Sequence, residues 1–381
     1  MKLNLYKKHN SFLSLSVKKK KEKNDVKENI INLIKNSNLS QYSKKNKKIL
    51  ENIKDDLSTP NFKDEYTFCL NDNVIDELVT YDQKDIIKYL IHRYRYEIFP
   101  KKKIVDEFPP YLQIEPSSIC NYRCVFCFMT DKSLTNKKNG HMGQMKLELF
   151  KEVIDSACGN IEFLSLASRG EPMACKDIDK MLQYTVGKFL NLKINTNASL
   201  LNEKKIHSIL CGGVKTLVIS ADAADENTYK KLRVNGDLKK VLGNLELFNT
   251  IKEKYYPETN IITRVSGVKV SDDQNFDDMK SIWGGLVDQV AFVNYNPWEN
   301  SYDKESNEII EPCSDLWRRM FVWWDGKVNP CDVDYKSQLS TGVFNGNLSS
   351  LWNSENYEKL RITHLNNDRK NLKPCNACVV V

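Results

Sequence analysis

The chain has 381 residues, which is long enough for one large domain and a smaller one. Its 41% hydrophobic and 28% charged residues are ordinary for a folded globular protein. No stretch approaches the roughly 20 consecutive apolar residues of a membrane-spanning helix. The stretch SFLSLSV near the N-terminus is too short and too polar to be the core of a secretion signal. We therefore expect a cytoplasmic protein, in which clustered cysteines serve as metal ligands rather than as disulfides.

Charge is unevenly spread along the chain. Residues 1–48 hold 14 lysines and three acidic residues, whereas the whole chain has a net charge of only +7, so the remainder is mildly acidic. Such a basic arm can contact nucleic acid or anionic lipid. Because it has few aromatic residues and glycines, we interpret 1–50 as a solvated tail, partly disordered or helical. The acidic remainder argues against a nucleic-acid-binding enzyme.

Residues 51–109 are predicted to form a helical N-terminal extension. The sequence VIDELVTYDQKDIIKYLIHRYRYEIFP spaces its apolar residues as one or two helices do, and it ends at Pro100. The chemistry of the chain is expected to begin after this segment.

From 110 to 300 the chain alternates short apolar stretches with amphipathic ones. The predicted strands are YLQIEP, IEFLSLAS, LNLKINTN, VKTLVIS, NIITRVSGVKV and DQVAFVNYN. Helical patterns such as MKLELFKEVIDSACG and LKKVLGNLELFNTIKEK lie between them. This alternation indicates right-handed βαβ units and a parallel sheet. Six strands fit an incomplete (β/α)6 barrel or an open doubly wound sheet, with the site at the carboxyl ends of the strands in either case.

Polar residues and glycine follow four of these strands at that same end. Three cysteines follow the first strand, and SRGEP (Ser168–Pro172) follows the second. Asn195 and Asn197 end the third strand, and Ser220 and Asp222 end the fourth. Core packing alone would not place polar residues at one end of the sheet each time. The convergence predicts an active site there.

The three cysteines lie within CNYRCVFC, at positions 120, 124 and 127. Closely spaced thiolates are soft ligands that suit zinc or an iron–sulfur cluster. A structural zinc ion takes four ligands, whereas a 4Fe-4S cluster held by three cysteines leaves one iron open. An open metal position usually binds a substrate or cofactor. We therefore predict that Cys120, Cys124 and Cys127 are metal ligands.

Residues 301–381 have a different pattern, with a hairpin expected around Asp325-Gly326 and a helix near the C-terminus. Four cysteines are spaced C-x17-C-x43-C-x2-C, which suits a zinc ribbon about as well as a cluster. These four candidate metal ligands are Cys313, Cys331, Cys375 and Cys378. Of the other cysteines, we interpret Cys158 and Cys211 as core thiols on helix faces and Cys175 as structural.

Several motifs together resemble the radical S-adenosylmethionine (SAM) superfamily, in its SPASM/twitch branch. They are CxxxCxxC with an aromatic residue before the third cysteine, GEP after the second strand, INTNASLL on the third, and ISADAADENTYKKLRVNGDLKKVLGN after the fourth. DGKVNPC, GNLSSLWNS and CNAC resemble a shortened, four-cysteine SPASM extension. The resemblance covers about 110–378, and it favours an auxiliary 4Fe-4S cluster over zinc at the C-terminal cysteines.

The resemblance also implies which residues contact SAM. The open iron of the first 4Fe-4S cluster would bind the amino and carboxylate groups of SAM. The expected contacts from the protein are Phe126, Ser168, Gly170, Glu171, Asn195, Asn197, Ser220 and Arg233. For Arg233 the alternative is a charge on a helix surface. One departure is that Arg169 stands where relatives commonly have glycine, which puts the local turn in doubt.

The function that the resemblance implies is radical chemistry on a small polar substrate such as a sugar or aminocyclitol, with a net two-electron oxidation. A flavodoxin- or ferredoxin-type protein would supply the electron that starts it. Tyr295, Glu299 and Lys269 are candidates for the base, which stays unassigned. One alternative is modification of a peptide, with the N-terminal extension handling that peptide. An alternative of another class is a zinc-stabilised binding protein.

Overall fold

The computed structural model describes residues 5–6, 12–17, 23–59 and 64–381. The described residues fall into two compact units. One contains the strand at residues 12–17 together with 107–381, and the other lies within 18–106. Each unit is described by itself.

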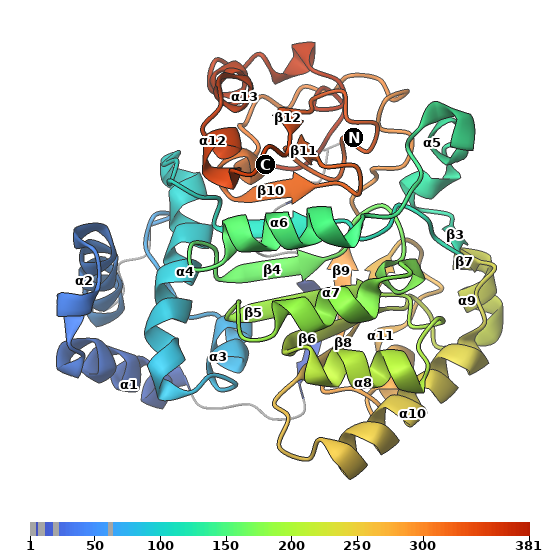
Figure 1. The fold of residues 1–381 in the computed structure, drawn as a ribbon, viewed down its shortest axis with the longest axis horizontal. Helices are drawn as coiled ribbons and strands as arrows, with labels where there is room; N and C mark the ends of the chain where they lie inside the picture. Colours follow the sequence, from blue (N-terminus) through green and yellow to red (C-terminus); the bar gives the residue numbers. More distant parts are fainter. Residues whose placement is uncertain (1–4, 7–11, 18–22, 60–63) are drawn as a thin grey trace. The chain divides into compact units, whose positions relative to one another are not determined.

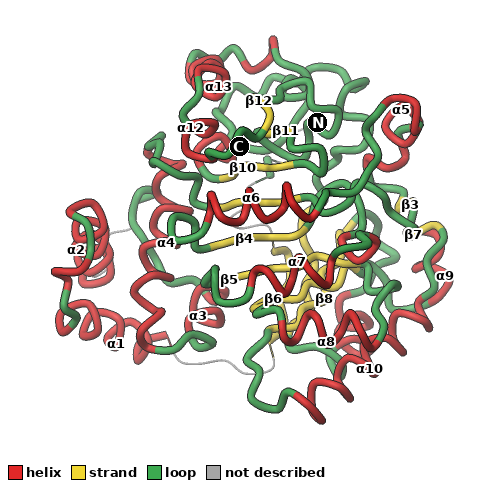
Figure 2. Tube along the Cα trace, in the orientation of Figure 1, coloured by secondary structure: helices red, strands yellow, loops and turns green. Residues whose placement is uncertain are grey.

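The first unit is built on six parallel strands, shown in Figures 1 and 2, and this confirms the predicted incomplete (β/α)6 barrel. All six predicted strands are present. Their bounds are β2 (Tyr111–Ile114), β4 (Phe163–Leu166), β5 (Asn191–Thr196), β6 (Val214–Ser220), β8 (Ile262–Lys269) and β9 (Gln289–Asn294). They are neighbours in this order across the sheet, each parallel to the next.

Helices cover one face of these strands. They are α6 (Leu147–Ala157), α7 (Ile178–Thr185), α8 (Glu203–Cys211), α9 (Glu226–Leu232), α10 (Leu238–Tyr255) and α11 (Phe276–Trp283). Figure 1 shows α6, α7 and α8 side by side in front of the sheet. Strand residues alternate between two faces, and those such as Leu164, Leu166 and Ile194 are fully buried. Residues of the opposite parity, such as Ser165 and Asn195, line the barrel interior.

The C-terminal segment continues the same sheet. β10 (Arg319–Val322) pairs in parallel with β2, and β11 (Lys327–Asn329) and β12 (Gly342–Val343) follow in antiparallel fashion. The predicted hairpin is present between β10 and β11, where Gly326 has a φ of +84°. Two helices follow, α12 (Leu348–Trp352) and α13 (Glu355–Leu365). The C-terminal cysteines are therefore anchored to the barrel through the β2–β10 pair.

At the other edge of the sheet, β1 (Phe12–Val17) pairs antiparallel with β9. Tyr6 also bridges to Val380, so a piece of the N-terminal region lies beside the C-terminal residues. The prediction of a solvated tail over residues 1–50 is therefore wrong for β1, which is part of the sheet. An edge strand depends on a distant partner, and a local composition argument does not detect it.

The second unit contains four helices, α1 (Lys23–Asn36), α2 (Lys44–Ser58), α3 (Asp72–Leu78) and α4 (Gln83–Lys102). The predicted boundary at residue 50 falls inside α2, which buries Ile49, Leu50 and Ile53. α4 continues two residues past Pro100 and ends at Lys102. Among the described residues, no helix is long and apolar enough to cross a membrane.

Short 3-10 turns connect several of these elements. One of them, η3 (Phe128–Thr130), begins directly after the third cysteine of CNYRCVFC.

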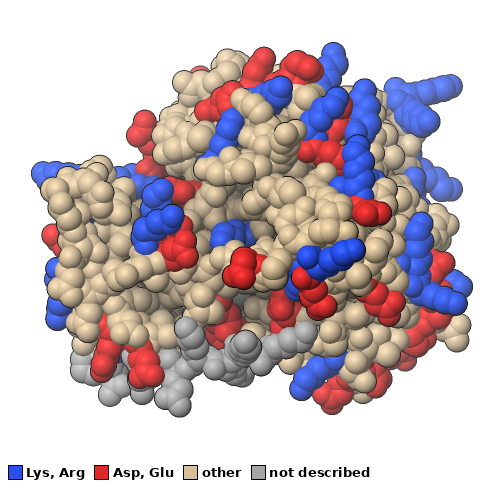
Figure 3. Space-filling view, turned by 60° about the horizontal axis from the view of Figure 1, so that its bottom comes forward, with Lys and Arg blue, Asp and Glu red and all other residues tan. Residues whose placement is uncertain are grey.

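On the face shown in Figure 3, acidic and basic side chains are interspersed. Lys230 and Glu226 form an exposed ion pair at 3.0 Å.

Candidate functional site

The loop after β2 brings the three predicted ligands Cys120, Cys124 and Cys127 together. Their charges interact, because each of the other two thiolates raises the pKa of Cys127. Burial raises the pKa of Cys120 to about 12 and raises that of Cys124. Backbone N–H groups of Tyr122 and Met129 lie 3.4 and 3.5 Å from the sulfurs of Cys120 and Cys127. Thiols that lie close together beside N–H donors fit a 4Fe-4S cluster in which three of the irons each take one thiolate.

No group of three or more His, Cys, Asp and Glu side chains in the described part of the chain is arranged to hold a single metal ion. A cluster does not require such an arrangement, because each cysteine binds a different iron. The three thiols therefore fit the predicted cluster by their mutual approach and by their N–H donors.

Arg233 lies next to this loop because of a small antiparallel pair of strands. β3 (Arg123–Cys124) pairs with β7 (Arg233–Val234), and Cys124 is opposite Arg233. The guanidinium Nη1 is 3.7 Å from Cys124 Sγ, and Nε is 2.6 Å from an oxygen of Asp222. Arg233 is only 5% exposed. The alternative of a helix-surface charge is therefore wrong.

The SRGEP loop packs tightly against the cysteine loop. Gly170 lies so close to residues 117–119 that a Cβ atom would be 2.2 Å from the carbonyl oxygen of Ser117. Ser168, two residues earlier, has a φ of +128°, which is uncommon for a residue with a side chain. Its Oγ is buried and has no hydrogen-bond partner among the described residues. The backbone here is thus held close to the segment that leads into Cys120.

Glu171 joins this loop to the end of β5. One carboxylate oxygen accepts hydrogen bonds from Thr196 Oγ1 (2.6 Å) and the Met173 N–H (3.0 Å), and the other accepts from the Asn197 N–H (2.7 Å). Burial raises the pKa of Glu171, and these hydrogen bonds oppose that effect. Both carboxylate oxygens of Glu171 accept hydrogen bonds from the protein. Glu171 therefore positions two loops at the end of the barrel.

The remaining predicted SAM contacts lie at the same end of the barrel. Asn197 donates to Asn121 Oδ1 at 3.0 Å, and its amide nitrogen is 4.0 Å from Cys120 Sγ. Asn195 Oδ1 is buried without a hydrogen-bond partner among the described residues. Ser220 is the last residue of β6. The carbonyl oxygen of Phe126 accepts a hydrogen bond from Trp298 Nε1 at 3.0 Å.

Arg169, which departs from the family pattern, is buried, and all three nitrogens of its guanidinium donate hydrogen bonds. Its Nε and Nη2 atoms donate to the two oxygens of Glu115 at 2.7 and 2.6 Å, and Nη1 donates to the carbonyl of Tyr335 at 2.9 Å. The guanidinium lies 4.6 Å from the ring of Trp323. Sequence reasoning noted Arg169 as an anomaly but did not find this role. The sequence did contain one signal of this role, namely a charged residue inside SRGEP, whose backbone packs closely against a neighbouring loop.

The four C-terminal cysteines also face one another. Cys331 interacts electrostatically with Cys375 and Cys313, and Cys375 interacts with Cys378. Burial raises the pKa of Cys313 to about 12 and raises those of Cys331 and Cys375 well above the usual value. A set of four thiols can saturate a metal site, unlike the set of three.

A buried arginine that the sequence analysis did not identify supports this second set. Arg369 is 1% exposed. Its Nη1 donates to the carbonyl of Glu311 at 2.7 Å, and its Nη2 donates to those of Cys375 and Cys378 at 3.1 and 2.9 Å. One side chain therefore holds the chain before Cys313 against the final CxxC.

The other cysteines differ in part from expectation. Cys175 is buried, with its sulfur 4.0 Å from that of Met181, in agreement with a structural thiol. Cys158 and Cys211 are exposed, so their prediction as core thiols is wrong. Both lie at helix ends, where Cys158 caps α6 and Cys211 is the last residue of α8.

The three candidate bases are not equivalent. Lys269 donates to the backbone carbonyl of Gln274. The Tyr295 hydroxyl donates to Glu299 Oε1, and burial together with this carboxylate raises the pKa of Tyr295. The second oxygen of Glu299 is buried without a hydrogen-bond partner among the described residues. Tyr295 and Glu299 therefore form a pair just past the end of β9.

Comparisons with known proteins agree with this arrangement. Residues 114–279 match the sequence model of the radical SAM superfamily, and residues 313–379 match that of the SPASM iron–sulfur cluster-binding domain. The chain is 28% identical over 215 residues to a GTP 3',8-cyclase of Clostridium botulinum (strain Okra / Type B1), which is 54% of this chain and 64% of the cyclase. The match therefore spans less than two thirds of that relative.

Solved structures show a similar fold at low identity. Streptococcus suis SuiB bound to the precursor peptide SuiA has a TM-score of 0.50 at 16% identity, covering 83% of this chain and 78% of SuiB. BtrN in complex with AdoMet and 2-DOIA has a TM-score of 0.49 at 17% identity, covering 72% of this chain and 94% of BtrN.

The structure shows an incomplete parallel barrel whose compact unit holds two separate sets of cysteines. The chain belongs to the radical SAM superfamily and carries a C-terminal SPASM domain. Its cofactors are accordingly SAM, a SAM-binding 4Fe-4S cluster and an auxiliary iron–sulfur cluster.

Proposed function

We propose that this enzyme oxidises a small polar substrate, such as a sugar or aminocyclitol, by two electrons. The observation that carries the proposal is the second set of four thiols, in the same compact unit as the set of three. A saturated cluster beside a radical site is suited to accept an electron from the substrate. When bound, the first cluster and SAM supply a 5'-deoxyadenosyl radical that abstracts a hydrogen atom.

The first cluster is proposed to bind Cys120, Cys124 and Cys127, and the auxiliary 4Fe-4S cluster to bind Cys313, Cys331, Cys375 and Cys378. The approach of the thiols within each set and the N–H donors beside the first set support this assignment. Arg233, fixed by Asp222 next to Cys124, is proposed to receive the carboxylate of SAM through a charge-assisted hydrogen bond.

A polar barrel interior supports a polar substrate. Ser165 pairs in register with Gln113 and with Lys193, so these three side chains lie in one row across the barrel lining. Nearer the carboxyl ends of the strands, Ser220 is opposite Ser266. Hydroxyl and amine groups of a substrate would find partners on this surface, whereas an apolar substrate would leave them unpaired.

Oxidation of a carbon that bears a hydroxyl or amine also requires removal of a proton. Glu299 is the preferred candidate base, because one of its oxygens has no partner among the described residues and the other receives the Tyr295 hydroxyl. Lys269 is less suited, since its amine is occupied by a backbone carbonyl.

A second candidate function is radical modification of a peptide. It is favoured by a groove within the helical unit, lined by residues of α1, α3 and α4 that include Asn29, Leu33 and Ile87. An extended peptide segment could lie in such a groove. Measuring whether the enzyme binds a sugar or aminocyclitol, or instead binds a peptide, separates the two candidate functions.

The test uses anaerobically reconstituted enzyme and substrates labelled with deuterium at carbon. A panel of deuterated sugars and aminocyclitols is incubated with the reduced enzyme and SAM, and 5'-deoxyadenosine is analysed by mass spectrometry. Transfer of deuterium together with formation of the oxidised product supports the proposal. Transfer only from a labelled peptide, with none from the polyol panel, would assign the enzyme to the second candidate.

Two cysteine variants test the assignment of the clusters. Cys124→Ala is expected to abolish SAM cleavage, whereas Cys378→Ala is expected to retain cleavage and lose product oxidation. Iron content should fall by about four atoms in each case. The assignment fails if Cys378→Ala loses SAM cleavage at saturating SAM while the first cluster is intact.

A further inference from the structure

The segment that follows Cys331 connects the two cysteine sets. Asp334, Tyr335 and Lys336 lie three to five residues beyond Cys331. The oxygens of Asp334 accept hydrogen bonds from the N–H groups of Gln338 and Leu339, both at 2.9 Å, so the segment is a defined turn. We call residues 334–336 the connecting segment. It contacts two separate loops at the end of the barrel.

The first contact is with the SRGEP loop, through Arg169. The Arg169 guanidinium donates to the carbonyl of Tyr335 and makes a two-point pair with Glu115, which directly follows β2. Glu115 in turn lies 3.4 Å from the N–H of Trp324, in the β10–β11 hairpin. Arg169 is 3% exposed and Glu115 is fully buried. A buried fork of this kind has one favourable geometry, and a lysine cannot reproduce it.

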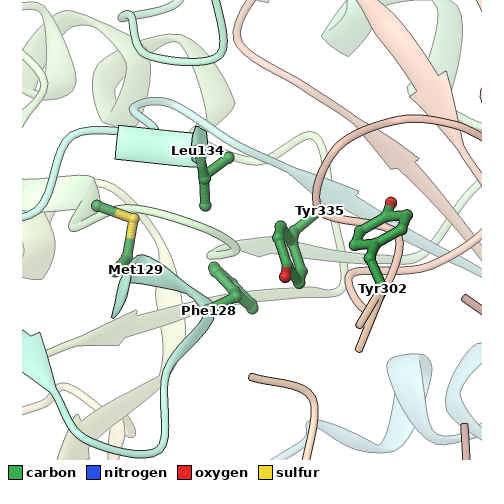
Figure 4. Close-up of a cluster of buried hydrophobic side chains, with 5 residues drawn as sticks. All are labelled: Phe128, Met129, Leu134, Tyr302 and Tyr335. Carbon is green, nitrogen blue, oxygen red and sulfur yellow. The ribbon is translucent and has the colours of Figure 1, made fainter. Parts of the chain in front are cut away.

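The second contact is with the residues after Cys127. The ring of Tyr335 stacks on that of Phe128 at a centroid distance of 5.2 Å, and Figure 4 shows the two side chains next to each other. The Tyr335 hydroxyl donates to Asp131 at 3.1 Å, and the Lys336 amine lies 2.7 Å from the same carboxylate. Phe128 belongs to a buried cluster with Tyr302, and Cys120 and Cys127 pack against this cluster. The connecting segment therefore touches both loops that surround the first cysteine set.

We propose that Arg169 is a positioning residue through which the auxiliary-cluster domain sets the geometry of the SAM-binding loop. Arg169 stands between Ser168, with its positive φ, and Gly170, which packs against residues 117–119. The backbone N–H of Arg169 also donates to Glu115, at 3.1 Å, so the same carboxylate holds both the guanidinium and the backbone of this loop. The connecting segment begins three residues after Cys331, so a change at the auxiliary site can reach the SAM loop along it. The proposal is independent of the substrate.

The test is SAM affinity, measured without any substrate on the reconstituted full chain. Equilibrium dialysis gives the Kd, and the change in the electron paramagnetic resonance signal of the reduced first cluster on adding SAM gives an independent readout. Arg169→Lys is expected to weaken SAM binding roughly tenfold at unchanged iron content, as loss of a supporting contact commonly does. Arg93→Lys is the matched control, because Arg93 is a buried arginine paired with Glu97 in the separate helical unit. It should leave the Kd unchanged.

A double-mutant cycle tests the path of the coupling. The pair Cys375→Ala and Cys378→Ala removes the auxiliary site and is expected to weaken SAM binding while the first cluster stays loaded. Adding Arg169→Lys to that background should then have little further effect. Wild-type affinity in Arg169→Lys, or the full tenfold loss in both backgrounds, would overturn the proposal. Neither result bears on which substrate is oxidised.

Discussion

Replacing Gly170 by alanine tests the close packing between the two loops at the predicted SAM site. The added Cβ would lie 2.2 Å from the carbonyl oxygen of Ser117, 2.6 Å from the carbonyl carbon of Ser118 and 2.7 Å from the nitrogen of Ile119. All three atoms belong to the backbone, so no side-chain rotation can relieve the contact. The loop must move by about 1 Å to restore ordinary separations, and a shift of that size in a reacting site can cost about a hundredfold in rate.

The energetic cost follows from the same contacts. Overpacking of this kind typically destabilises a protein by about 1–3 kcal/mol. Gly243→Ala is the matched control, because Gly243 lies within α10 and its added Cβ meets nothing within 4 Å. Alanine there should stabilise the protein by about 0.5–1 kcal/mol, since glycine is unfavourable inside a helix.

The assay has two parts. Urea denaturation of both variants gives the free energies of unfolding, and SAM cleavage is followed on reconstituted enzyme under reducing conditions. We expect Gly170→Ala to retain the fold and to lose about a hundredfold in SAM cleavage. Gly243→Ala should cleave SAM at the wild-type rate. Wild-type cleavage and stability in Gly170→Ala would refute the inferred close contact between the loops.

Three further substitutions have expected outcomes. Arg233→Lys keeps the charge beside Asp222 but loses the guanidinium fork that also reaches Cys124. The Kd for SAM should therefore rise roughly tenfold, and an unchanged Kd would show that Arg233 is not part of the SAM site. Glu299→Gln should leave substrate-independent SAM cleavage intact and lower substrate oxidation by about 10²–10⁴-fold, and equal product formation would exclude it as the base. Arg369→Lys should reduce iron content by about four atoms while SAM cleavage persists, and full iron content would show that the carbonyl contacts are dispensable.

The sequence predicts most of the barrel, because each strand and helix has a local pattern. The predicted VKTLVIS, for example, corresponds to β6 at Val214–Ser220. The alternation of elements also determines that polar residues such as Asn195 and Ser220 meet at one end of the sheet. These inferences need only short stretches of sequence and the handedness of βαβ units.

The features that the sequence does not predict depend on contacts between distant residues. β1 is stabilised by β9, about 275 residues away along the chain, and β10 by β2. Arg169 finds its partners Glu115 and Tyr335 only in the folded protein. Helical periodicity places Cys158 and Cys211 on helices but does not determine burial at helix ends. Composition left open whether the lysine-rich stretch was disordered or helical, and it did not reveal that α2 buries one face.

The most direct test of the account is the metal content and SAM chemistry of the anaerobically reconstituted protein. The account predicts about eight iron atoms and eight sulfides per chain, from one cluster at each cysteine set. It also predicts formation of 5'-deoxyadenosine and methionine from SAM on reduction. Bound zinc with no cleavage of SAM would contradict it and would favour a zinc-stabilised binding protein.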